Sequence, residues 1–174
     1  MRFLTVSCLA GPLAAAALLG CSCAREQPPS QASAMLVRGT MSFGVRLYDS
    51  LRAQPGNLFI SPYSACESLA MAYAGARGNT ATQMSDALCC TLDPLELASA
   101  FGETDARLRA AAKAGRSELA MAAGLWAHDD YPFLDTFTRV IRNRFRAELG
   151  SVDFVAAEAA RSEINEWVAA KTAD

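Results

Sequence analysis

The apolar positions at residues 57–76 predict a buried strand that leads directly into a buried helix. A short apolar run at 58–60 precedes Ser61, which can cap free backbone N–H groups at a helix start, and Pro62, which suits a first helical position. From Pro62 to residue 76 the chain is apolar on most sides of a helix, so this helix is expected near the centre of a domain. The apolar positions that recur at helical spacing are Ala65, Leu69, Ala72 and Tyr73.

Two glycines are expected to separate this helix from a second one. Gly75 and Gly78 can end the first helix, because glycine readily adopts the conformations found at helix C-termini. The sequence Thr-Ala-Thr-Gln at 80–83 has the spacing of a capping box, in which two side chains satisfy backbone N–H groups at a helix start. A second helix is therefore predicted to follow at once and to reach about Leu88.

Two amphipathic helices flank this central stretch. Residues 35–52 carry apolar side chains every three or four positions and predict a first helix. Asp93, Pro94 and Glu96 supply a cap, a first-turn proline and an acidic third position, so another helix is predicted to run from there to about Lys113, with Gly115 as its stop. The stripe of the first helix comprises Leu36, Thr40, Phe43, Leu47 and Leu51.

The last third of the chain is expected to contain strands and helices in turn. Residues 117–126 are apolar on both faces of a strand, which predicts a strand inside a sheet that is covered on both sides. A helix is predicted from Pro132, and a strand at 148–154. In the final helix, 155–170, Ile164, Trp167 and Val168 share one stripe, which we expect to pack on the sheet. The predicted fold class is therefore α+β.

Composition and charge favour one exported globular domain. The 174 residues are 52% hydrophobic and 20% charged with a formal net charge of −2, which does not favour a nucleic-acid partner. Arg2 is followed by an uncharged apolar run, so residues 1–20 are predicted to be a signal peptide. The segment 18–21, Leu-Leu-Gly-Cys, resembles the bacterial lipobox, which implies a lipid on Cys21. The alternative is that Cys21 is a plain cysteine near a standard cleavage site.

Residues 21–34 are accordingly interpreted as a lipidated Cys21 followed by a flexible tether rich in Ser, Pro and Gln. This organisation predicts an exported protein, either extracellular or anchored to the outer membrane of a bacterium. Residues 35–174 then form the domain.

The sequence offers few residues for catalysis or metal binding. His128 is the only histidine, and no metal-ligand spacing of cysteines is present, so neither a metal nor a cofactor is predicted. Cys66 and at least one of Cys89 and Cys90 are interpreted as small apolar core thiols. No Gly-x-Ser-x-Gly or Ser-x-x-Lys motif is present, so the chain is not predicted to be an enzyme.

Two segments resemble the serpin family. The run from Asn57 through 84, Ser-Pro and Gly-Asn-Thr-Ala-Thr included, is similar to the serpin segment from a buried sheet-B strand through helices B and C. Residues 152–172 resemble strand one of sheet A and helix F. A segment like Ala-Asn-Ala-Leu-Phe in strand two of sheet A is replaced here by Ala-Ala-Gly-Leu-Trp at 122–126. The motif residues carried over are Asn57, Pro62, Gly78, Asn79, Thr80, Thr82, Asn165 and Trp167.

The resemblance implies the N-terminal portion of a serpin domain at 35–174: helices A to F, one sheet-B strand and two sheet-A strands. Serpins trap serine proteases by inserting a cleaved reactive loop into sheet A. Ser61 and Ser64 match the family's shutter region, where the strands of sheet A part, although an ordinary helix cap explains them too. No counterpart of the reactive loop is recognised, so the domain is interpreted as truncated.

The resemblance therefore implies a serpin-type serine protease inhibitor as the complete protein, with a serine protease as partner and this chain inactive by itself. The alternative is a non-inhibitory surface lipoprotein of serpin fold, or a decayed gene product. A third reading, nucleic-acid binding through the Gly-x-x-Gly at 75–78, conflicts with the net charge and the predicted export. Arg107, Arg109, Lys113 and Arg116 leave glycosaminoglycan binding as a weak possibility beside ordinary stabilisation of a helix C-terminus.

Overall fold

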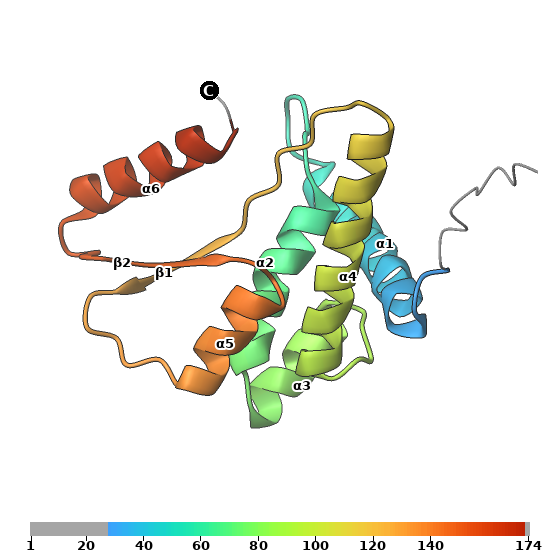
Figure 1. Ribbon diagram of the computed structural model, residues 1–174, viewed down its shortest axis with the longest axis horizontal. Coiled ribbons are helices and arrows are strands. Elements are labelled where there is room, and N and C mark those ends of the chain that lie inside the picture. Colours follow the sequence, from blue (N-terminus) through green and yellow to red (C-terminus); the bar gives the residue numbers. More distant parts are fainter. Residues whose placement is uncertain (1–27, 173–174) are drawn as a thin grey trace, which may run out of the picture.

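The computed structural model describes residues 28–172 and contains a packed group of helices followed by a two-stranded sheet and a last helix (Figure 1). The α+β class predicted from the sequence is confirmed. The elements in chain order are α1 (Gln31–Leu51), α2 (Pro62–Gly75), α3 (Gly78–Ala87), α4 (Pro94–Ala114), β1 (Gly124–His128), α5 (Asp135–Asn143), β2 (Glu148–Val152) and α6 (Ala157–Thr172).

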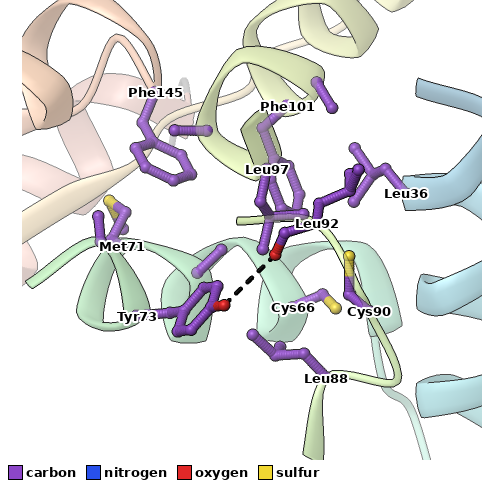
Figure 2. Close-up of a cluster of buried hydrophobic side chains, with 14 of the residues drawn as sticks. Leu36, Cys66, Met71, Tyr73, Leu88, Cys90, Leu92, Leu97, Phe101 and Phe145 are labelled. Carbon is purple, nitrogen blue, oxygen red and sulfur yellow. Dashed lines mark hydrogen bonds between the residues drawn. The ribbon is translucent and has the colours of Figure 1, made fainter. Parts of the chain in front are cut away.

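The core lies where α1, α2 and α4 pack against one another (Figure 2). Phe101 is fully buried at its centre and contacts Tyr63 edge-on, with 5.4 Å between the ring centroids. The hydroxyl of Tyr73 donates a hydrogen bond to the backbone oxygen of Leu92 at 3.3 Å, which satisfies the polar end of a buried ring. Burial of this apolar surface is the main stabilising contribution to the helical group.

Glycine allows two of the closest contacts between these elements. A side-chain Cβ at Gly44 of α1 would lie 2.9 Å from the Cβ of Pro62, so only glycine lets the start of α2 approach α1 this closely. At Gly102 of α4, a Cβ would lie 2.6 Å from the backbone oxygen of Arg144, just after α5. Both positions therefore fix how the helices are spaced.

The predicted caps of α2 and α4 are confirmed. Ser61 is the N-cap of α2 and Pro62 its first residue. At α4 the Asp93 carboxylate accepts hydrogen bonds from the backbone N–H groups of Leu95 and Glu96, and the Glu96 carboxylate accepts one from the N–H of Asp93. Gly115 is the C-cap of α4. These signals involve residues a few positions apart, so they do not depend on tertiary packing.

The buried face of α2 differs from the predicted stripe. Leu69 is 40% exposed and Ala72 is exposed, whereas Tyr73 is buried as expected. Because α2 is apolar nearly all round, its sequence could not determine which side would meet α1 and α4. The residues buried on α2 are Cys66, Ala70, Met71, Tyr73 and Ala74.

The sheet is parallel, and its two strands are connected through α5. Gly124 pairs with Glu148, and the register continues to the pair of His128 and Val152. Two parallel neighbours need a crossover connection, and α5 supplies it. Trp167 of α6 packs edge-on against Trp126 of β1, with 4.7 Å between the ring centroids. The prediction that this face of α6 meets the sheet is confirmed for Trp167, although Val168 is 43% exposed.

The predicted strand at 58–60 is wrong. Residues 57–61 have no regular secondary structure, and Phe59 is 98% exposed. A strand is stabilised by a hydrogen-bonded neighbour, and within residues 28–172 no strand pairs with this segment. The buried sheet-B strand expected from the family resemblance is therefore not formed in the described part of the chain.

The predicted helix start at 80–83 is also wrong. Helix α3 begins at Gly78, Arg77 is its N-cap, and no side chain caps it. Gly78 has a φ of +57°, a conformation that L-residues rarely adopt, and this allows the chain to turn directly into α3. Thr80 therefore lies inside the first turn instead of before it.

Three further boundaries differ from their predictions. Helix α1 begins at Gln31, so residues 31–34 of the predicted tether are helical, because the Ser30 hydroxyl accepts a hydrogen bond from the N–H of Ser33 and caps the helix. Only Gly124 onwards forms the strand expected at 117–126, because the register with β2 begins there. The helix expected from Pro132 begins at Asp135.

Candidate functional site

The two serines assigned to the shutter region lie together at the N-terminus of α2. Their hydroxyl oxygens are 2.9 Å apart, and the Ser61 hydroxyl also accepts a hydrogen bond from the backbone N–H of Ser64 at 3.3 Å. Both side chains are exposed. The geometry is that of a helix cap, and within residues 28–172 no histidine or lysine is hydrogen-bonded to either hydroxyl to activate it as a nucleophile.

One turn further along α2, a set of ionisable side chains links α2 to α4. Asp105 is buried, with only 5% of its surface exposed, and its carboxylate accepts a hydrogen bond from Arg109 Nε at 2.9 Å. Glu67 lies on the facing side of α2, and the negative charge of Asp105 acts on it. We name Tyr63, Glu67, Asp105 and Arg109 the α2–α4 polar cluster.

Arg109 connects the α2–α4 polar cluster to the segment that precedes β1. Its Nη2 donates a hydrogen bond of 2.7 Å to the backbone oxygen of Met121. Residues 117–123 are outside the sheet, so this bond replaces part of the strand pairing that the segment lacks. Arg109 thus holds the approach to β1 against α4.

The surroundings of the α2–α4 polar cluster raise the pKa values of two of its side chains, Glu67 and Tyr63. The pKa of Glu67 is raised to about 7, chiefly by burial and secondly by the negative charge of Asp105, while the Arg109 cation partly opposes the shift. Burial also raises the pKa of Tyr63, whose hydroxyl has no hydrogen-bond partner within the described residues. A carboxyl group that is half-protonated near neutral pH therefore lies beneath the segment that leads into β1.

A cavity of about 230 Å³ separates this region from the last turns of α6. Glu67 and Ser64 line it from α2, and Trp167 lines it from α6. Its remaining lining residues are Ala120, Met121, Ala122, Val168, Lys171 and Thr172.

Helix α6 is tied to the sheet by a polar contact beside the two tryptophans. Trp167 Nε1 donates a hydrogen bond to the Glu148 carboxylate at 2.7 Å, and Lys171 Nζ lies 3.2 Å from the same oxygen. Hydrogen bonding from Trp167 first, and from Lys171 second, lowers the pKa of Glu148. The contact joins α6 to the first residue of β2.

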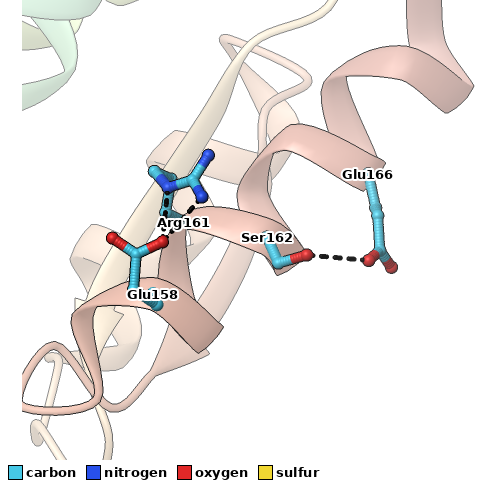
Figure 3. Close-up of polar contacts among 4 residues, drawn as sticks. All are labelled: Glu158, Arg161, Ser162 and Glu166. Atoms are coloured by element: carbon cyan, nitrogen blue, oxygen red, sulfur yellow. Dashed lines mark hydrogen bonds and ion pairs between the residues drawn. The ribbon is translucent and has the colours of Figure 1, made fainter.

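The outward face of α6 is polar. Figure 3 shows Arg161 bound to the Glu158 carboxylate, with Nη2 at 2.6 Å, and the Ser162 hydroxyl donating to Glu166. These pairs lie one turn apart along an exposed helix surface, where ion pairs contribute little to stability. The face with Trp167 is therefore the one that binds the rest of the domain.

The motif residues carried over from the resemblance fall into two groups. Pro62, Gly78 and Trp167 have the structural roles described above, and the Thr82 hydroxyl donates to the backbone oxygen of Gly78 at 3.5 Å. The structure does not gather the others into one site, and all of them are exposed: Asn57 lies in the loop before α2, Asn79 and Thr80 lie in the first turn of α3, and Asn165 lies on α6. The lipid site predicted at Cys21 lies outside the described residues.

The cysteines and the histidine behave as structural residues in the described range. Cys66 and Cys90 are buried free thiols whose pKa values are raised by burial, which agrees with the prediction of small core thiols. His128 is exposed and accepts a hydrogen bond from the N–H of Phe154 at 3.3 Å. Among residues 28–172, no three His, Cys, Asp or Glu side chains are placed to hold a metal ion.

The structure gives less support to glycosaminoglycan binding than the sequence does. Arg109, one of the four cations considered for glycosaminoglycan binding, is already hydrogen-bonded to the carboxylate of Asp105 and the backbone oxygen of Met121.

The helices between residues 28 and 172 include none with the length and apolar character needed to cross a bilayer.

Sequence reasoning missed the α2–α4 polar cluster. Asp105 and Arg109 are four residues apart on a helix, a spacing that favours an ion pair and could have been noticed. Glu67 is the one acidic residue in an apolar helix, which is a second signal. The bond from Arg109 to Met121 had no signal in the sequence, because any residue could supply that backbone oxygen.

Comparison with known proteins gives a consistent result. The family model described as Serpin (serine protease inhibitor) matches residues 38–174. The leukocyte elastase inhibitor of Bos taurus is 42% identical over 119 residues, which is 67% of this chain and 30% of that protein. Iripin-1 of Ixodes ricinus is 36% identical over 146 residues, which is 82% of this chain and 37% of that protein.

The fold of the chain is similar to that of solved structures named as serpins. A structure of cleaved Serpin 42Da superposes with a TM-score of 0.71 and 28% sequence identity, covering 81% of this chain and 37% of that one. The chain thus spans about a third of the length of the proteins it matches. Because the family match extends over most of the chain and the fold agrees, the chain belongs to the serpin family.

Proposed function

We propose that this chain is the N-terminal portion of a serine protease inhibitor that works by the serpin mechanism, and that the chain inhibits no protease by itself. The observation that carries the proposal is the family match over residues 38–174 together with relatives named as leukocyte elastase inhibitor. The partner of the complete protein is then a serine protease. The complete protein then acts as an inhibitor, and this chain performs no catalysis of its own.

The geometry around α2 is suited to this mechanism. Insertion of a cleaved loop requires the strands of sheet A to part above the N-terminus of α2, where Ser61 and Ser64 lie. The segment before β1 is held there by the side chain of Arg109 and is rich in small residues, so its release breaks few strong contacts. Its position beside the 230 Å³ cavity supports a role in such a movement.

The test compares the longest translation product that contains residues 35–174 with the 174-residue chain. Each is incubated with a panel of serine proteases, elastases included, and residual protease activity is followed over time. The longer product is expected to cause a progressive loss of activity that dilution does not reverse, and the 174-residue chain is expected to cause none. Simple cleavage of the longer product without lasting inhibition would favour the alternative, a non-inhibitory protein of serpin fold.

The same proposal includes export and a lipid anchor on Cys21. The apolar residues 1–20 and the Leu-Leu-Gly-Cys sequence at 18–21 support it. Mass spectrometry of the mature N-terminus is expected to show an acylated Cys21 in the membrane fraction. An unmodified N-terminus at another residue, recovered in the soluble fraction, would refute the anchor and leave the inhibitor proposal untouched.

A further inference from the structure

A second and larger cavity, of about 700 Å³, lies at the opposite end of α2 from the two serines. Elements distant in sequence surround it: the C-terminus of α2, the starts of α3 and α4, and residues 131–140. Ser61 and Gly75 are separated by the length of α2, about 20 Å at 1.5 Å per residue. The cavity is therefore distinct from the α2–α4 polar cluster, and its volume is in the range of small-molecule sites.

One wall of this cavity is aromatic and firmly held. Tyr131 and Phe133 pack edge-on with 4.9 Å between the ring centroids, and Phe133 and Phe137 follow at 5.1 Å. Phe137 in turn lies against Gly75, where a Cβ would come within 3.2 Å of the ring. Successive rings supported by a helix end form a preformed surface for a flat apolar group.

The rim of the cavity exposes an unusual amount of apolar surface. Tyr131 is 63% exposed, Leu134 is 72% exposed and Leu95 is 59% exposed, and all three line the same cavity. Single exposed apolar side chains are normal, but several around one concave site are typical of a binding surface.

Arg77 gives the cavity a positioned cation. Its Nη1 donates to the backbone oxygen of Ala76, the C-cap of α2, at 2.6 Å and to that of Ala74 in the last turn at 3.2 Å, so these carbonyl groups hold the guanidinium group in place. Both bonds use Nη1, and no other residue of the described range 28–172 is bonded to the Nε and Nη2 donors, so these are available to a ligand. Asp93 also lines the cavity, but its carboxylate already accepts two backbone N–H groups at the start of α4.

We propose that this cavity binds a small aromatic carboxylic acid, with the apolar rings against Phe133 and Phe137 and the carboxylate on Arg77. Arginine is well matched to a carboxylate, because its planar donors can form two parallel hydrogen bonds. The lining supplies one cation with unused donors and an aromatic wall, which is the pattern that an apolar acid requires. Neither the inhibitor proposal nor loop insertion is needed for this site.

The test titrates the 174-residue protein with 2-naphthoate and, separately, with the neutral analogue 2-naphthylmethanol, using ligand-observed NMR. We expect saturable binding of 2-naphthoate, about tenfold tighter than that of the alcohol, because a charge-assisted pair is lost with the alcohol. Arg77→Gln should reduce the affinity for 2-naphthoate to that for the alcohol and leave the affinity for the alcohol unchanged. Arg139→Gln, on the exposed side of α5, is the matched control and should change neither affinity.

A second pair of variants tests the aromatic wall. Tyr131→Ala should weaken both compounds about fivefold or more, because the variant removes the exposed end of the ring stack. Tyr48→Ala on α1 removes another exposed tyrosine, 53% exposed and away from the cavity, and should have no effect. Absence of saturable binding, equal affinities for the acid and the alcohol, or equal effects of Tyr131→Ala and Tyr48→Ala would overturn the proposal.

Discussion

Replacement of Glu67 by glutamine should remove a pH-dependent loss of stability from the domain. The carboxyl group lies on α2 against Asp105 and Arg109, and its pKa in the folded protein is about 7, compared with 4.5 for the ordinary group. Because the folded state holds this proton more tightly, Glu67 contributes its full stability below about pH 4.5, and this contribution is lost as pH rises through 7. Glutamine has the same shape and never ionises.

The size of the effect follows from the shift in pKa. A change from 4.5 to about 7 corresponds to roughly 3 kcal/mol at 1.36 kcal/mol per unit, and partial exposure of the side chain to solvent reduces this to about 1–2 kcal/mol. Glu67→Gln should therefore differ least from the wild type in unfolding free energy at pH 5 and exceed it by about 1–2 kcal/mol at pH 8.

The assay is urea unfolding between pH 5 and pH 8, followed by the fluorescence of Trp126 and Trp167. Glu163→Gln serves as the control, because Glu163 is exposed on α6 and its replacement should leave the pH profile unchanged. A Glu67→Gln variant that differs from the wild type by the same amount at every pH would refute the assignment of this pH dependence to Glu67. So would a variant that is less stable at pH 8.

Three further substitutions test the packing, each by urea unfolding. Trp167→Ala should cost about 2–3 kcal/mol because it removes the ring that packs on Trp126 and the hydrogen bond to Glu148, and an unchanged midpoint would place Trp167 in solvent. Gly102→Ala should cost about 1–3 kcal/mol, since its Cβ would lie 2.6 Å from a backbone oxygen; a neutral result would mean that α4 and α5 are not in close contact. Asp93→Ala should cost about 1 kcal/mol and Asp93→Asn clearly less, and equal losses would argue against the cap.

The starts of α2 and α4 could be predicted from the sequence because their capping signals are local. Asp93, Pro94 and Glu96 act within one turn, so the start of α4 was predicted correctly. The same reasoning failed at Thr80, where the positive φ of Gly78 started α3 before the expected box. A capping motif indicates where a helix can begin, and the backbone before it decides whether it does.

Strands were less predictable because pairing depends on residues far away in the sequence. Apolar alternation over 117–126 describes side chains, but the ladder extends only over the residues that β2 reaches, from Gly124 onwards. The run at 58–60 has strand-like composition and no paired neighbour within residues 28–172. Sequence patterns therefore predicted the apolar character of these segments and missed their hydrogen bonding.

Only part of the candidate site could be predicted, because its other residues come together through packing between distant parts of the chain. Ser61 and Ser64 were identified because the cap and the family motif coincide in sequence. Glu67 and Asp105 are brought together only by the packing of α2 on α4, and the apolar surroundings of α2 that raise the pKa of Glu67 exist only in the folded domain.

The proposal of a serpin-type inhibitor is tested most directly by the mass of its reaction product with a protease. The longest translation product containing residues 35–174 is mixed with an elastase-type serine protease and analysed by mass spectrometry under denaturing conditions. We expect one species whose mass equals that of the protease plus the inhibitor without its C-terminal cleavage fragment, because the protease remains acyl-linked. Cleaved inhibitor and free, active protease as the only products would contradict it.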